Sequence, residues 1–146
     1  MKENKYDNPV FFEKYGQMER SRKGLAGAGE WETLRGMLPG FAGKRVLDLG
    51  CGYGWHCIYA VEQGAASVVG VDISGKMLEV AREKRAGLPI EYRQCAMEDI
   101  DFPAGSFDIV LSSLAFHYLA SFSPIAEKVS RLLAPGGSFV FSVEHP

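Results

Sequence analysis

"VLDLGCGYGWH", residues 46–56, carries the strongest structural signal in this chain of 146 residues. An apolar run that contains one aspartate, Asp48, leads directly into three glycines at alternate positions, Gly50, Gly52 and Gly54. Glycine adopts backbone angles that other residues resist, and its missing side chain allows a ligand to touch the main chain. The stretch therefore predicts a buried strand followed by a loop that lies against a ligand. A tight strand-to-helix turn without a ligand is the alternative.

Outward from this stretch, strand-like apolar runs alternate with helical patterns. Strands are predicted at residues 45–50, 67–72, 90–95, 107–113 and 138–143, and helices at 55–64, 74–85 and 123–133. Ser74 is the expected N-cap of the second of these helices, and Pro135, Gly136 and Gly137 are expected to end the third. The alternation predicts an α/β fold with a mainly parallel sheet. Right-handed crossovers favour a doubly wound, Rossmann-like arrangement with helices on both faces.

The chain divides into two predicted parts. Residues 1–43 form a helical preamble or lid, with helices expected after Asn8-Pro9 and at residues 30–38. Residues 44–146 form the Rossmann-like domain.

Composition excludes several classes of protein. Hydrophobic residues make up 47% and charged residues 23%, with a net charge of −2, as in ordinary globular domains. Without long basic runs, no nucleic acid partner is expected. Membrane association is not expected, because no apolar run approaches the roughly 20 residues that span a bilayer. The N-terminus lacks an apolar signal core, which predicts a cytoplasmic protein. Cys51, Cys57 and Cys95 lack CxxC spacing, so neither a disulfide framework nor a metal site is expected.

The spacing of the glycines helps to distinguish between the candidate ligands. The dinucleotide fingerprint is GxGxxG, and Trp55 occupies the position of its third glycine, which argues against NAD or FAD. Asp72 ends the second predicted strand, where a carboxylate accepts hydrogen bonds from both ribose hydroxyls of a nucleoside; a helix-capping role is its alternative. Asp48 needs a cation or hydrogen-bond donors if it is buried, and a ligand with an ammonium group would satisfy it.

Five stretches together resemble the successive motifs of the class I S-adenosylmethionine-dependent methyltransferases, most of all those that act on small molecules. They are "VLDLGCGYG", "VVGVDIS", "KMLEVAREK", "CAMEDIDFPAGSFDIVLSSLAFHYL" and "LLAPGGSFVFSV", and the resemblance covers residues 44–146. It implies S-adenosyl-L-methionine as cofactor, S-adenosyl-L-homocysteine as product, and a small-molecule methyl acceptor.

The resemblance also implies roles for individual residues. The loop residues Gly50, Cys51, Gly52 and Gly54 bend around the methionine part of the cofactor, Asp48 supports its ammonium, and Asp72 holds the ribose. The remaining contacts are Ile73 and Met77 against the adenine face, Met97 and Glu98 along the adenine edge, and Leu114 at the methionine end. Ala96 departs from the family, which often has Asp at that place beneath the adenine amino group.

Candidate catalytic residues follow the fourth and fifth predicted strands. His117, Glu144 and His145 are expected at the rim where an acceptor would approach, and a histidine with a near-neutral pKa suits proton transfer. A base is needed only when the acceptor must lose a proton. Purely structural roles are the alternative for all three residues.

The family's sheet usually has seven strands, and this sequence stops after the fifth. The sequence therefore predicts either a fragment of a longer protein or an edge covered by a partner subunit, with association expected through residues 138–143. Three functions follow from the sequence: a small-molecule methyltransferase, a cofactor-binding module without turnover, and a nucleotide-sugar or NAD-dependent enzyme.

Overall fold

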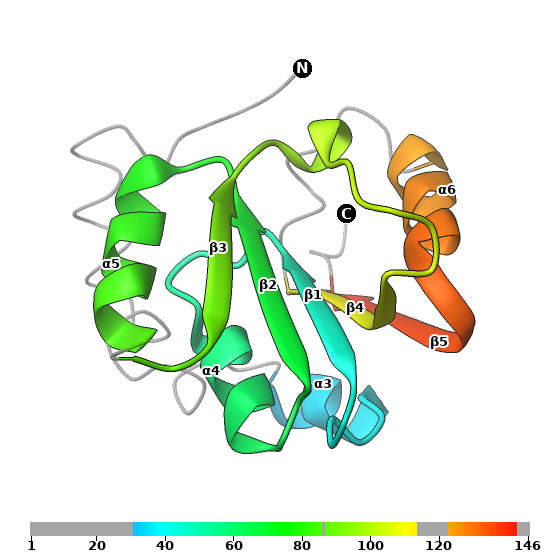
Figure 1. Cartoon of the computed structure of the whole chain (residues 1–146), viewed down its shortest axis with the longest axis horizontal. Helices are drawn as coiled ribbons and strands as arrows, with labels where there is room; N and C mark the ends of the chain where they lie inside the picture. Colours follow the sequence, from blue (N-terminus) through cyan, green and yellow to red (C-terminus); the bar gives the residue numbers. More distant parts are fainter. Residues whose placement is uncertain (1–30, 86, 114–122, 143–146) are drawn as a thin grey trace.

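The computed structural model describes residues 31–85, 87–113 and 123–142. Five strands form one parallel sheet in the order β3-β2-β1-β4-β5 (Figure 1). The strands are β1 (Arg45–Leu49), β2 (Ser67–Asp72), β3 (Ile90–Gln94), β4 (Phe107–Ser113) and β5 (Leu133–Ser142). The predicted doubly wound fold is confirmed. The order reverses between β1 and β4, and the crevice beyond their carboxyl ends is where such sheets bind ligands.

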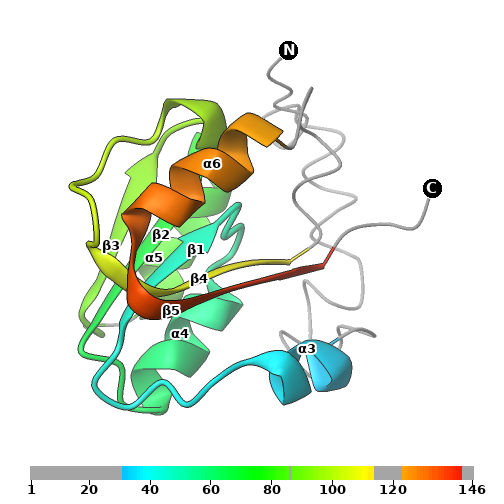
Figure 2. The ribbon, with the colours of Figure 1, turned by 90° about the vertical axis from the view of Figure 1, so that its right-hand side faces the viewer.

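Helices cover both faces of the sheet. Val46 packs with α4 (Trp55–Glu62) and α5 (Gly75–Arg85) in one apolar cluster. Leu47 and Leu49 pack with α6 (Ser123–Leu132) in a second cluster on the other face. Figure 2 shows α6 and α4 on opposite sides of the sheet. The alternation of side chains along β1 therefore supplies two cores, as expected for a strand buried on both faces.

The predicted start of the fifth strand is wrong. Instead of beginning at residue 138, β5 begins at Leu133, directly after α6, because Leu133 pairs with Phe107 and a register shift follows on β4. Gly136 adopts a φ of 81° within this segment. A Cβ on Gly137 would lie 3.0 Å from the Asp108 carbonyl oxygen. The glycines therefore allow the chain to continue alongside β4 rather than merely ending the helix.

Other boundaries agree with the prediction to within one or two residues. The backbone N–H of Met77 donates to Ser74 Oγ at 3.2 Å, so the predicted N-cap of α5 is confirmed. The helix α3 (Trp31–Met37) was expected at residues 30–38, and its Trp31 and Leu34 pack with Val140 of β5.

An ion pair joins the amino ends of β1 and β4. The backbone N–H of Arg45 and its guanidinium donate to Asp108, at 2.9 to 3.1 Å. These bonds lower the pKa of Asp108 to about 2. Among the described residues, no helix is long and apolar enough to cross a membrane.

Candidate functional site

The glycine loop, residues 50–54, lies at the carboxyl end of β1, where the strand order reverses. Gly50, Gly52 and Gly54 all have positive φ, between 55° and 82°. The backbone N–H groups of Gly50 and Cys51 both donate to the Val71 carbonyl, at 2.8 and 3.0 Å. The loop is thus fastened to the end of β2 by its own backbone, and positive φ makes glycine the favoured residue at its three turns.

Asp72 fastens the same loop from the end of β2. Its Oδ2 accepts from the Gly52 N–H, and its Oδ1 accepts from the Ser74 N–H, both at 2.8 Å. The bond to Ser74 is of the kind expected from the helix-start alternative, so Asp72 has a structural role whatever else it does. Each carboxylate oxygen can accept more than one hydrogen bond, so these two bonds do not by themselves exclude a further donor.

Asp48 lies beneath the loop and is 1% exposed. Its Oδ2 accepts a weak hydrogen bond from the Cys57 thiol at 3.5 Å. Burial raises the pKa of Asp48 to about 8, and the nearby Asp72 charge adds to the effect. The groups that shift its pKa are thus a thiol and another acid rather than a cation. A bound ammonium group would favour the ionised carboxylate there.

Two residues that the sequence analysis missed complete the underside of the loop. Asp48, Gly70 and Tyr92 lie in one row across β1, β2 and β3. A Cβ on Gly70 would lie 2.8 Å from the Tyr92 ring, and a Cβ on Gly54 would lie 2.1 Å from the Tyr92 hydroxyl. Tyr92 therefore fills the space that these two glycines leave. A glycine inside the strand "SVVGVD" is a sequence signal for such a close approach.

The thiols near the loop are buried. Cys51 and Cys57 are 6% and 0% exposed, and burial raises the pKa of both thiols. Cys51 Sγ would lie 2.9 Å from a Cβ on Gly70, so the Cys51 side chain faces the core. Only the Cys51 backbone is available to a ligand at the loop. Among the described residues, no three His, Cys, Asp or Glu side chains are placed to hold a metal ion.

Of the residues expected near adenine, Ile73 follows β2, Met77 lies in α5, and Met97 and Glu98 follow β3. Met77 is buried, and its Cε would lie 3.2 Å from a Cβ on Gly52. The Ile73 carbonyl accepts from Gln94 Nε2 at 3.1 Å. Met97 and Glu98 lie in a short 3₁₀ helix, η3 (Met97–Asp99), which was not predicted, and buried Ala96 precedes it.

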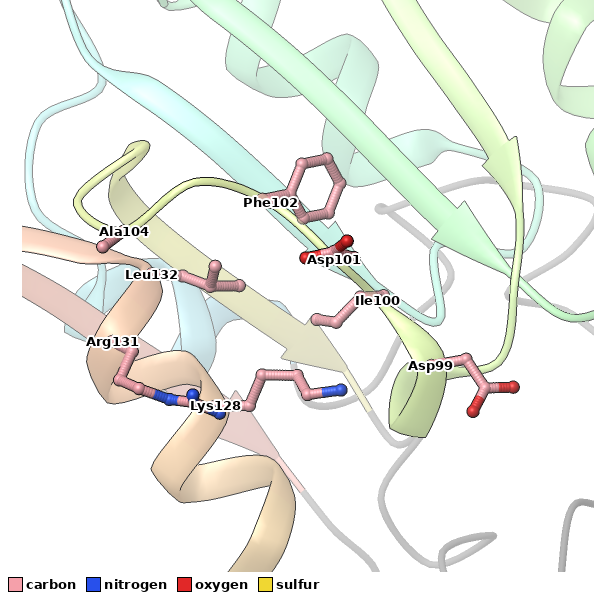
Figure 3. A pocket seen from close by; sticks show the side chains of 8 residues that line it. All are labelled: Asp99, Ile100, Asp101, Phe102, Ala104, Lys128, Arg131 and Leu132. Atoms are coloured by element: carbon pink, nitrogen blue, oxygen red, sulfur yellow. The ribbon is translucent and has the colours of Figure 1, made fainter.

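The helix α6 supports this segment from the side. Lys128 Nζ donates to the Glu98 carbonyl at 2.6 Å. Lys128 also lines a hollow of about 400 Å³, shown in Figure 3. Its lining mixes apolar side chains with two acids and two bases: Asp99, Ile100, Asp101, Phe102, Ala104, Lys128, Arg131 and Leu132. None of the predicted site residues lines it, so this hollow is separate from the glycine loop.

Four predicted site residues lie outside the described residues: Leu114, His117, Glu144 and His145. The described residues that the structure brings together are Asp48, the glycine loop, Asp72 and Met77, around the carboxyl ends of β1 and β2. The fold and these residues define a Rossmann-like domain with a glycine loop at its switch point, the place where such sheets bind ligands.

Comparison with known proteins gives the family. The model of the family "Methyltransferase domain" matches residues 47–141. A crystal structure of an S-adenosylmethionine-dependent methyltransferase from Mesorhizobium loti is 47% identical, with a TM-score of 0.81 over 84% of this chain and 57% of that one. A Listeria monocytogenes structure described in similar terms is 54% identical, with a TM-score of 0.78 over 81% of this chain and 55% of that one.

The relatives are longer than this chain. A protein of Haemophilus influenzae is 37% identical over 97% of this chain but only 58% of its own length. The chain thus spans a little over half the length of these proteins. It belongs to the class I S-adenosylmethionine-dependent methyltransferases, a family of enzymes, and S-adenosyl-L-methionine is the cofactor of this domain.

Proposed function

We propose that this chain forms the cofactor-binding part of a methyltransferase that acts on a small-molecule acceptor. The observation that carries the proposal is the glycine loop at the strand-order switch, fastened to Asp72 by the 2.8 Å bond from Gly52. Two relatives bear small acceptors in their names, a ubiquinone biosynthesis O-methyltransferase and a fatty-acid O-methyltransferase. Another is named a tRNA U34 carboxymethyltransferase, so the family also includes enzymes of RNA.

The residues present fit the cofactor. When bound, S-adenosylmethionine supplies a methyl group already activated by a sulfonium. The bare backbone at Gly52 would receive its methionine part, Asp48 its ammonium, and Asp72 its ribose. Ile73, Met77, Met97, Glu98 and Leu114 would line the adenine side and the methionine end. The buried Asp48 carboxyl, whose charged neighbour is another acid, is the structural feature that best matches a cationic ligand group.

The remaining assignments complete the proposal. His117, Glu144 or His145 would take a proton from the acceptor, and residues 1–43 would close over the site. We propose the cytoplasm as the location of the protein. A cofactor-binding module without turnover is the second candidate.

Binding of the cofactor product tests the site. Calorimetry should detect S-adenosylhomocysteine and not NADH. Asp72→Ala should weaken S-adenosylhomocysteine binding by about 1–3 kcal/mol, because it removes a charged acceptor from the ribose and from the loop. Asp101→Ala, which changes an exposed acid of the separate hollow, is the matched control and should bind normally. Unchanged affinity in folded Asp72→Ala would place the cofactor elsewhere.

Turnover separates the two candidate functions. The chain is incubated with methyl-labelled S-adenosylmethionine and a panel of phenols, carboxylic acids, amines and tRNA. Transfer to a small molecule supports the methyltransferase proposal, and transfer to tRNA alone contradicts its acceptor class. Cofactor binding without any transfer supports the binding module.

A further inference from the structure

Tyr92 presents a buried hydroxyl that the proposed cofactor contacts do not use. The residue is 8% exposed, and its Oη has no hydrogen-bond partner at normal geometry among the described residues. Such an orphaned donor in a protein interior is costly and calls for an explanation. Phenylalanine would fill the same space without that cost.

The position of this hydroxyl is fixed by glycines on two neighbouring elements. Gly70 stands between Asp48 and Tyr92 in the row across the sheet, and the ring of Tyr92 lies against it. The hydroxyl ends under Gly54, which is the N-cap residue of α4 and the last residue of the glycine loop. The Tyr92 side chain thus reaches from β3 to the underside of the glycine loop.

Cys57 connects this hydroxyl with Asp48. The Cys57 thiol donates to Asp48 Oδ2 at 3.5 Å, and Tyr92 and Cys51 flank the same sulfur. The Tyr92 hydroxyl, although it lacks a hydrogen bond of normal geometry, is placed to donate toward the Cys57 sulfur and lowers the pKa of that thiol; the bond from Cys57 in turn lowers the pKa of Asp48, so the donors are ordered Tyr92, Cys57, Asp48. The groups that influence Asp48 are Cys51, Cys57, Tyr92 and Asp72, from the loop, α4, β3 and β2. A chain of donors that ends on a carboxylate strengthens when the carboxylate becomes charged.

We propose that Tyr92 is a positioning residue of the cofactor site, whose hydroxyl supports the Gly54 turn and, through Cys57, steadies the Asp48 carboxylate that meets the cofactor ammonium. This inference rests on the proposed role of Asp48. The Cys57–Asp48 link is long, at 3.5 Å, and the Tyr92 hydroxyl at the other end of the series has no hydrogen bond of normal geometry among the described residues. Ionisation of Asp48 on binding tightens both links.

The test compares Tyr92→Phe with Tyr59→Phe, which makes the same change on α4 where the ring packs edge-on against Trp31 and Phe41. Binding of S-adenosylhomocysteine is measured by calorimetry from pH 5.5 to 9, with circular dichroism to verify folding. Tyr92→Phe should weaken binding at pH 7 by about three- to tenfold, the effect of one buried hydrogen bond. The pH of half-maximal affinity should also move upward, because Asp48 ionises less readily without the donor. Tyr59→Phe should change neither quantity.

A second variant tests the same series of donors without changing Tyr92. Cys57→Ala interrupts the same chain and should produce the same upward shift in pH. The double variant Cys57→Ala/Tyr92→Phe should bind no more weakly than the weaker single variant, because both changes remove one pathway. A Tyr92→Phe protein with wild-type affinity and pH profile, or strictly additive losses, would overturn the inference. If wild-type protein binds no S-adenosylhomocysteine at all, the proposed cofactor site itself fails, which is a distinguishable result.

Discussion

In the proposed site, Asp48 links the stability of the domain to ligand binding. Its carboxyl is nearly inaccessible to solvent, and its pKa is raised to about 8 chiefly by burial. A buried carboxyl without a cation is destabilising in its charged form, so the cofactor-free protein holds the proton at neutral pH. An ammonium group of a ligand would instead favour the ionised form of Asp48. Binding at pH 7 should therefore release a proton from Asp48, and the energetic cost of the buried acid is offset only in the complex.

Asp48→Asn should separate these two effects. The folded pKa lies above the unfolded value of about 4, so this group's contribution to stability is full below about pH 4 and declines as pH rises toward 8. The asparagine does not ionise, so the variant lacks this decline and should gain stability relative to wild type between pH 5 and pH 8. Urea denaturation of cofactor-free protein at these two pH values measures the difference.

The same variant should lose affinity for S-adenosylhomocysteine, because it removes the charge that we propose for binding the cofactor ammonium. Asp101→Asn is the control at an exposed acid and should change neither stability nor affinity. A stability difference between wild type and Asp48→Asn that stays constant with pH would show that Asp48 ionises normally in the folded protein.

At the scale of the elements, β2 depends on a glycine in its middle. Gly70 allows the Tyr92 ring of β3 and the Cys51 thiol to occupy the space above β2, each closer than 3.0 Å to where a Cβ would stand. Ring and sulfur atoms in a packed core cannot withdraw freely. The strand therefore tolerates no side chain at this position without displacing the support of the glycine loop.

Gly70→Ala should destabilise the domain by about 1–3 kcal/mol, the usual range for overpacking a core. Gly36→Ala is the matched control, because Gly36 lies in α3 and a Cβ there would meet nothing within 4 Å. That control should be neutral or stabilise by about 0.5–1 kcal/mol, through the better helix propensity of alanine. Chemical denaturation of both variants measures the two effects, and equal stabilities would contradict the packing explanation.

The sequence predicted the elements whose formation depends on residues close together along the chain. The apolar alternation around Asp48 and the caps at Ser74 predicted strands, helices and the glycine loop, because these depend on near neighbours. The start of β5 at Leu133 depends instead on pairing with Phe107 on another strand. The role of Tyr92 likewise depends on the register of three strands, which no single stretch of sequence contains. The sequence therefore predicted the glycine loop and the strand ends, but not the tyrosine that packs beneath the loop.

At the scale of the whole molecule, the two edges of the described sheet differ. On β3, Arg82 donates to the Tyr92 carbonyl and Arg85 to the Ile90 carbonyl, at 3.3 and 3.5 Å. The Cys95 N–H bonds to Asp72 of β2, so by the two-residue period of a strand these alternate carbonyls face away from β2. Two arginines thus occupy the acceptors of the β3 edge. Such protection discourages pairing with other chains.

The β5 edge carries no comparable charges. Its Phe141 is 37% exposed and lies beside Phe139, within the uncharged stretch Ser138–Ser142. Exposed apolar edge strands invite pairing with another copy of the chain.

We therefore predict that the 146-residue chain associates through β5 as its concentration rises. Phe141→Lys should reduce this association, because it places a charge on the edge. Met37→Lys, which changes a side chain 61% exposed on α3, is the control and should leave association unchanged. Light scattering after size-exclusion chromatography measures the mass over a range of concentrations. A wild-type chain that stays monomeric at every concentration, or a Phe141→Lys variant that associates as strongly as wild type, would show that the chain does not associate through β5.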